Sequence, residues 1–176
     1  MNTHAWRIEE REYARHLERR GRIHAYEQLK PERTALVVID MVPFFVAESP
    51  YALGIVANIA RLADTLRAAG GTVAWVLPAG TPARADFYGP ASRVFRRSAG
   101  DGPLRERLWR EFQVHDQDIL VEKTAASAFF PGRCPLPGLL DERDIDTVLI
   151  TGTVTNVCCE SSARDAATLV SATREN

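Results

Sequence analysis

The sequence has few cysteines, almost no net charge and no apolar run long enough to cross a bilayer. Its formal net charge is −1 at pH 7, so no overall positive field recruits nucleic acid or an anionic membrane. Three cysteines, two of them adjacent, form a poor framework for disulfides. Residues 1–10 lack the apolar core of a secretory signal. We therefore expect a cytoplasmic protein that binds neither nucleic acid nor membranes.

Histidine is also scarce, and its positions do not suggest a metal site. No two histidines have the spacing of metal ligands, and none accompanies a cysteine as a Cys–His pair. The four are His4, His16, His24 and His115. Internal repeats and low-complexity segments are absent from the chain, and its 176 residues are enough for one domain with a sizeable core.

The chain divides into two regions by composition. Residues 1–33 are rich in Arg, Glu and His, and we expect an N-terminal extension with one or two short surface helices. Its arginines alternate with glutamates, which argues against a nucleic-acid contact. Residues 34–176 show alternating strand and helix patterns, and we expect them to form the main domain.

This alternation predicts an α/β fold with a mostly parallel sheet covered by helices on both faces. Strands are expected at 34–39, 72–77, 118–122 and 147–151, and helices at 55–66, 104–112, 137–143 and 158–169. Two loops, 43–51 and 78–103, are expected to carry the specificity of a pocket. Three arginines of the second loop, Arg93, Arg96 and Arg97, are expected on a solvated face, with an anion or subunit contact as the alternative.

Residues able to do chemistry follow three of the predicted strands. Asp40 ends the first strand, Lys123 ends the third, and Cys158 comes shortly after Gly152 at the end of the fourth. If these strands are parallel neighbours, the three side chains meet at the carboxyl edge of the sheet, where ligands bind in open α/β folds. A thiol at a helix N-terminus is favoured as the nucleophilic thiolate. An acid, a cation and a thiol together form a nucleophile–base–orienter set.

Each of these residues also has an ordinary structural interpretation. Cys158 could be a buried inert thiol, Asp40 a turn or helix-capping residue, and Lys123 a solvated charge. Cys159 is expected to pack in the core, and Cys134, in a loop with Pro and Gly, is expected to do no chemistry.

Three segments together resemble the isochorismatase-like cysteine hydrolases, the superfamily that includes nicotinamidase, N-carbamoylsarcosine amidase and ureido- and biuret-type hydrolases. The resemblance covers about three quarters of the chain. Its segments are Val37-Val38-Ile39-Asp40-Met41 with Phe45, the run Lys123-Thr124-Ala125-Ala126-Ser127-Ala128-Phe129, and Asp146 to Ala166.

The resemblance implies a flavodoxin-like three-layer sandwich and an Asp40–Lys123–Cys158 triad. It also implies a cis peptide bond between Thr153 and Val154, which would direct the backbone N–H groups of Val154 and Cys158 at an oxyanion. We further expect Phe45 and Phe129, which flank the base and the lysine, to contact substrate.

The chain departs from the family pattern in three places. Val42 and Pro43 stand where relatives often carry Gln and Asn, and this leaves the local substrate contacts open. Nicotinamidases bind a metal through Asp-x-His-x-x-x-His, but residues 75–95 contain Asp86 and no histidine, so we expect no metal and no cofactor. Relatives usually continue with two more strands, so we expect either a trimmed fold or C-terminal elements that are missing from this sequence.

The expected activity is hydrolysis of a C–N bond in a small amide, ureide or lactam through a thioester-type intermediate, by an enzyme that forms homo-oligomers. Three alternatives remain open. One is hydrolysis of a vinyl ether, as in isochorismatase, which needs the acid and not the thiol. Another is a thiol redox protein that uses the adjacent Cys158 and Cys159. The last is an interaction domain that retains the fold without activity.

Overall fold

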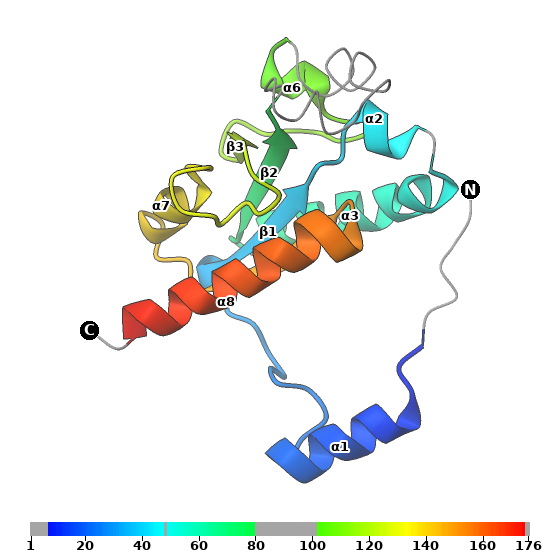
Figure 1. Cartoon of the computed structure of the whole chain (residues 1–176), viewed down its shortest axis with the longest axis vertical. Coiled ribbons are helices and arrows are strands. Elements are labelled where there is room, and N and C mark those ends of the chain that lie inside the picture. Colours follow the sequence, from blue (N-terminus) through cyan, green and yellow to red (C-terminus); the bar gives the residue numbers. More distant parts are fainter. Residues whose placement is uncertain (1–6, 48, 80–101, 175–176) are drawn as a thin grey trace.

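The computed structural model describes residues 7–47, 49–79 and 102–174. Figure 1 shows a sheet with helices packed on both of its faces, and a separate helix near the N-terminus. The elements are α1 (Glu10–Arg20), η1 (Pro31–Arg33), β1 (Thr34–Ile39), α2 (Pro43–Val46), α3 (Pro50–Ala68), β2 (Thr72–Pro78), α6 (Leu104–Arg107), β3 (Ile119–Lys123), α7 (Leu136–Asp141), β4 (Thr147–Gly152), η4 (Thr155–Cys159) and α8 (Glu160–Arg174).

The four described strands form one all-parallel sheet in the order β3-β2-β1-β4. All six residues of β1 are buried, as expected for an apolar, β-branched strand in the middle of a covered sheet. The register pairs Ile39 with Gly152 and Pro78 with Lys123, so the carboxyl ends of all four strands lie along one edge. The sequence analysis treated β1, β3 and β4 as neighbours, but β2 lies between β3 and β1.

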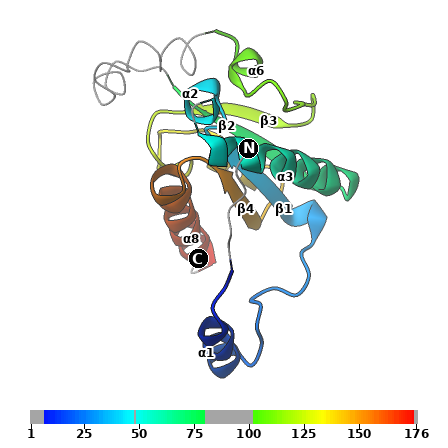
Figure 2. The same ribbon diagram turned by 90° about the vertical axis from the view of Figure 1, so that its right-hand side faces the viewer.

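Alternating side chains of the strands divide the core into two apolar clusters. On one face, Leu36 and Val38 of β1 pack with Trp75 of β2 and with the buried side of α3. On the other face, Val37 and Ile39 pack with side chains of α7 and α8. Figure 2 shows α3 and α8 on opposite sides of the sheet. The structure therefore has the three layers that the sequence predicts.

The segment 43–51, predicted as a loop, contains a short helix and the beginning of a longer one. Pro43 opens α2, and α3 begins at Pro50, because a proline at the first helical position lacks only an N–H that would be unpaired there. The Ser49 hydroxyl accepts a hydrogen bond from the Ala52 N–H at 3.2 Å and caps α3. The prediction of a loop was wrong because the apolar periodicity does not begin until later in α3.

The helix predicted at 104–112 is also shorter than expected. Only Leu104–Arg107 is helical, and Leu108 is extended. The Trp109 N–H donates to the Met41 carbonyl at 2.8 Å, and the Arg107 guanidinium donates to the Pro78 carbonyl at 2.6 Å. These tertiary hydrogen bonds hold the chain across the ends of β1 and β2, in place of continued helix.

The N-terminal region differs from the rest of the chain in its packing. Helix α1 buries none of its side chains, and it lies apart from the sheet (Figure 1). The expected division at residue 34 stays a prediction, as does the expectation about C-terminal elements. Within the described residues, the helices are too short or too polar to cross a membrane. Most of the 78–103 loop, including Arg93, Arg96 and Arg97, lies outside the described residues.

Candidate active site

Asp40 follows β1 at the carboxyl edge of the sheet, and its side chain is completely buried. Its backbone has a φ of +54°, a left-handed conformation that aspartate adopts more readily than most residues. The Asp40 N–H donates to the Val76 carbonyl at 2.9 Å. This conformation lets the chain leave β1 sharply while the carboxylate stays in the interior.

Lys123, the last residue of β3, is completely buried as well. Its Nζ donates to Asp40 Oδ2 at 2.7 Å and to the Ala125 carbonyl at 3.3 Å, and it lies 3.5 Å from Cys158 Sγ. The side chain therefore spans the width of β2 to reach the end of β1. A buried ammonium needs such an anion and such acceptors, because desolvation otherwise disfavours its charge.

Cys158 lies in η4, a π-helical turn that leads directly into α8, and 7% of its surface is exposed. The predicted strand, glycine turn and helix are therefore present, although the first turn is wider than an α-helical one. The peptide bond between Thr153 and Val154 is cis, as the resemblance implied. The three predicted residues come together from three separate segments of the chain.

The two oxygens of the Asp40 carboxylate have different surroundings. Oδ2 accepts a hydrogen bond from the Lys123 ammonium. Oδ1 is buried and has no hydrogen-bond partner among the described residues. A buried carboxylate oxygen without a donor is costly in an inert structure. Such an oxygen is free to accept a proton from a thiol or a bound molecule.

The other two cysteines are poor candidates for chemistry. Both are half-buried and pack against the apolar cluster that contains Cys158. Burial, and then the neighbouring Cys158, raises the pKa of Cys159 to about 12. Burial also raises the pKa of Cys134. Both side chains are therefore neutral thiols near neutral pH, and both are less reactive than a thiolate.

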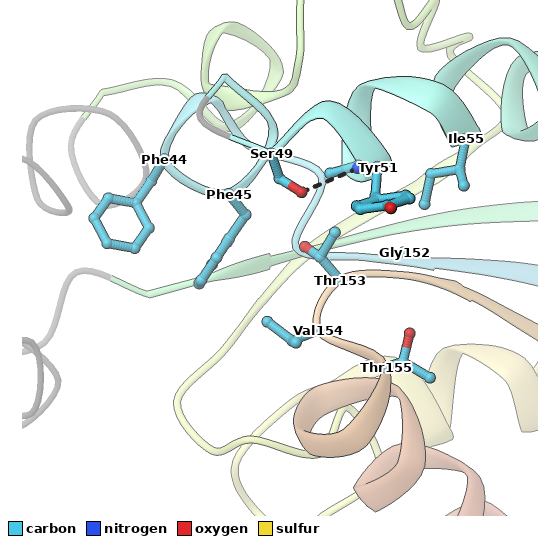
Figure 3. A pocket seen from close by; sticks show the side chains of 10 residues that line it. Phe44, Phe45, Ser49, Tyr51, Ile55, Gly152, Thr153, Val154 and Thr155 are labelled. Atoms are coloured by element: carbon cyan, nitrogen blue, oxygen red, sulfur yellow. Dashed lines mark hydrogen bonds between the residues drawn. The ribbon is translucent and has the colours of Figure 1, made fainter. Parts of the chain in front are cut away.

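A cavity of about 390 Å³ lies beside the turn that leads from β4 to Cys158. Figure 3 shows side chains from α2 and α3 on one side and the turn on the other. The lining residues are Phe44, Phe45, Ser49, Tyr51, Ala52, Ile55, Gly152, Thr153, Val154 and Thr155. Asp40, Lys123 and Cys158 are not among the lining residues, and all three are buried.

The two predicted aromatic contacts have different locations. Phe45 lines the cavity, where its ring packs edge-on against Phe44 with a centroid distance of 5.0 Å. Phe129 lies in the core with 4% of its surface exposed. Val154, whose N–H is the predicted oxyanion donor, lines the cavity and is 41% exposed. The roles of these residues stay predictions.

Two buried hydroxyl groups that the sequence analysis did not single out connect the segments of the site. Thr153 Oγ1 donates to the Asp40 carbonyl at 2.9 Å. Ser162 Oγ donates to the Cys158 carbonyl at 2.7 Å and accepts from the Ala128 N–H at 2.9 Å. Serine and threonine near a helix start are common as caps, so their sequence positions carry no signal for these long-range contacts.

No cluster of three or more His, Cys, Asp or Glu side chains suited to a metal ion occurs within 7–47, 49–79 and 102–174. Asp86, the one aspartate of residues 75–95, lies outside these ranges. The absence of a metal and a cofactor therefore stays a prediction.

Comparison with known proteins places this chain in a family. Residues 34–169 match the Isochorismatase domain. The chain therefore belongs to the isochorismatase family, and this confirms the resemblance seen in the three sequence segments.

Two curated relatives are ureidoacrylate amidohydrolases RutB. That of Rhizobium rhizogenes (strain K84 / ATCC BAA-868) is 33% identical, over 78% of this chain and 66% of its own length. That of Agrobacterium fabrum (strain C58 / ATCC 33970) is also 33% identical, over 78% of this chain and 71% of its own length. This chain thus spans about two thirds of the length of these relatives.

Solved structures with the same fold include two enzymes that bear on the site. A cysteine hydrolase from Pseudomonas syringae pv. phaseolicola 1448A has a TM-score of 0.67 and 28% identity, over 79% of this chain and 68% of its own. N-carbamoylsarcosine amidase from Thermoplasma acidophilum has a TM-score of 0.62 and 29% identity, over 76% of this chain and 75% of its own. The predicted α/β fold is confirmed. The amidase and amidohydrolase names agree with the predicted hydrolysis of a C–N bond in a small molecule.

Proposed function

We propose that this chain is a metal-independent cysteine hydrolase that cleaves a C–N bond of a small amide, ureide or lactam. The observation that carries the proposal is one buried group of three side chains. The Lys123 ammonium lies 2.7 Å from the Asp40 carboxylate and 3.5 Å from the Cys158 sulfur. Membership of the isochorismatase family and the names of the relatives support the same reaction.

In the first half of the reaction, Asp40 Oδ1 takes the proton of the Cys158 thiol, and the sulfur attacks the carbonyl carbon. The Lys123 ammonium stabilises the thiolate and holds the other carboxylate oxygen in place. The backbone N–H groups of Val154 and Cys158 stabilise the tetrahedral oxyanion, a contribution often worth about 3 kcal/mol per donor.

The second half returns the site to its starting state. The C–N bond breaks, the leaving nitrogen takes the proton from Asp40, and the acyl or carbamoyl group stays on sulfur as a thioester. Asp40 then accepts a proton from water while the oxygen of that water attacks the thioester carbon. The C–S bond breaks, the acid leaves, and the proton on Asp40 returns to sulfur.

The names of the relatives suggest where to look for the substrate. Ureidoacrylate and N-carbamoylsarcosine both carry a carbamoyl group on nitrogen, so ureides are the first class to test. The cavity beside Val154 would accept the rest of the substrate, with Phe45 in its lining, and Phe129, which is buried in the core, stays a predicted contact. A thiol nucleophile requires reducing surroundings, so we include a cytoplasmic location in the proposal, together with homo-oligomerisation.

The test is a screen of ureides, amides and lactams against the whole chain and its Cys158→Ala and Cys158→Ser variants. Ammonia or amine release measures turnover, and mass spectrometry of the acid-quenched enzyme detects an acyl or carbamoyl adduct on Cys158. We expect each variant to lose at least about a thousandfold in kcat/KM while it keeps its melting temperature.

The alternatives predict different results when the variants are assayed with other substrates. Hydrolysis of a vinyl ether that survives Cys158→Ala would establish isochorismatase-type chemistry and contradict the proposal. Peroxide-dependent thiol turnover that survives Asp40→Asn would indicate a redox protein. The raised pKa of Cys159 argues against this second outcome, because a neutral thiol is a poor partner for disulfide exchange.

A further inference from the structure

Thr153 connects the turn before Cys158 to the backbone of Asp40. It is the first residue after β4, and only 8% of its surface is exposed. Its Oγ1 donates to the Asp40 carbonyl at 2.9 Å, and its N–H donates to the Ile39 carbonyl at 2.9 Å. The residue therefore binds two consecutive carbonyls of a segment that lies more than a hundred positions away in the sequence.

The Asp40 backbone requires such support because its conformation is sparsely populated. A non-glycine residue with a positive φ persists only where its surroundings hold it. Its N–H is fixed by Val76 of β2, and its carbonyl also accepts the Val42 N–H at 2.9 Å. Among the described residues, Thr153 is the one side chain that donates a hydrogen bond to this carbonyl.

The two backbones are in direct contact at this point. Gly152 has a φ of +118°, and a Cβ built on it would lie 2.0 Å from the Ile39 carbonyl oxygen. Glycine is therefore required there for the turn to approach β1 closely. The close approach brings the Thr153 hydroxyl within reach of Asp40, so any rotation of the Asp40 peptide is transmitted to this hydrogen bond.

We infer that the Thr153 hydroxyl is a positioning group, which orients the Asp40 carboxylate toward Cys158 and Lys123. The inference rests on the proposed function, in which Asp40 is the base. Loss of the hydroxyl would let the Asp40 backbone relax from its left-handed conformation. The carboxylate would then move relative to the sulfur and the ammonium, and the rate of proton transfer would fall.

The experiment compares Thr153→Val, which replaces the hydroxyl by a methyl group of similar size, with Thr153→Ser, which restores it. Thr34→Val is the matched control. Thr34 is also buried, and its Oγ1 donates to the Lys30 carbonyl at 2.8 Å, but it lies at the opposite end of β1. Both valine variants lose one buried hydroxyl-to-carbonyl hydrogen bond, so a general loss of stability affects both.

We expect Thr153→Val to lower kcat about tenfold, the size that one ordinary hydrogen bond allows, while KM changes less than about twofold. Thr153→Ser recovers most of kcat, and Thr34→Val keeps the wild-type value. A rise in KM with unchanged kcat would instead make Thr153 a substrate contact, since it lines the cavity, and would overturn the inference.

A second measurement does not require a substrate. The rate of Cys158 alkylation by iodoacetamide, followed against pH by mass spectrometry, reports how the acid and the amine are placed around the sulfur. We expect its midpoint to shift in Thr153→Val and to stay unchanged in Thr153→Ser and Thr34→Val. If Thr153→Val does not fold, Thr153→Ala takes its place in both measurements.

The two proposals fail in distinguishable ways. A wild-type chain with neither turnover nor a Cys158 adduct contradicts the proposed function. Wild-type turnover combined with an unchanged kcat and alkylation profile in Thr153→Val overturns the positioning role alone. An equal loss of kcat in Thr153→Val and Thr34→Val overturns it as well, because the effect would then be one of stability.

Discussion

Asp118 and Asp40 both have fully buried carboxylates, and they lie at opposite ends of the parallel strands. Asp118 comes directly before β3, and Asp40 comes directly after β1. Asp118 is surrounded by donors: Arg67 Nε at 3.0 Å, Arg67 Nη2 at 2.7 Å, Trp75 Nε1 at 2.8 Å and the His115 N–H at 3.0 Å. Burial alone would raise its pKa, but the hydrogen bonds from Arg67, Trp75 and His115 hold that pKa below its usual value.

Asp40 has far fewer donors than Asp118. Among the described residues, the Lys123 ammonium is the one side chain that donates a hydrogen bond to its carboxylate, and Oδ1 has no partner. A carboxylate with all its lone pairs occupied contributes to stability and reacts poorly. A carboxylate with one oxygen in a hydrogen bond and the other without a partner can still accept a proton. The comparison therefore separates a structural aspartate from the proposed catalytic one.

The sharpest test of this comparison is to replace each aspartate by asparagine. We expect Asp40→Asn to lower kcat/KM by at least about a hundredfold, because an amide cannot take the thiol proton. Asp118→Asn should keep most of its turnover. Steady-state kinetics with any substrate identified in the screen measures both, and equal losses in the two variants would contradict the assigned roles.

The two asparagine variants should also differ in their free energy of unfolding. Asp118→Asn leaves the nearly buried Arg67 without its main anion, and we expect a loss of about 2–3 kcal/mol in the free energy of unfolding. Arg67 keeps Asp64 and the Gln113 carbonyl as acceptors, which limits the loss. Urea denaturation followed by circular dichroism gives the value, and an unchanged midpoint would show that the Arg67 pair is dispensable.

The pH dependence of stability sharpens the comparison further. Because the pKa of Asp118 is lower in the folded chain, its contribution is complete above the unfolded value of about 3.9. That contribution is lost as the pH falls through the lower, folded pKa. We expect the melting temperature of the wild-type chain to fall more steeply below about pH 4 than that of Asp118→Asn. Parallel curves for the two proteins would contradict this assignment.

The smallest effect is expected next to the proposed nucleophile. Cys159 has a pKa of about 12 and packs against the core, so it stays a neutral thiol. Cys159→Val should leave kcat/KM within about twofold of wild type, since valine fills similar space. Alkylation near neutral pH should label Cys158 and spare Cys159. Preferential labelling of Cys159 would reverse the roles of the two cysteines.

The strands and the chemistry-bearing residues could be predicted because their signals are local. An apolar run such as 34–39 that ends in Asp40, or a glycine turn before Cys158, is visible in the residues themselves. The shortness of α6 could not be predicted, since Arg107 and Trp109 bond to groups from distant segments. The open Asp40 Oδ1 and the Thr153 hydroxyl bond are likewise visible only after folding.

The sequence by itself determined the α/β class, the parallel sheet and the three residues at its carboxyl edge, because side-chain periodicity and strand ends follow from neighbours along the chain. Only the tertiary structure decided that β2 separates β3 from β1, that Lys123 reaches across it, and that one oxygen of Asp40 stays open. These features depend on the order of strands and on distances of a few ångströms between segments far apart in the chain. Local pattern carries no information about either.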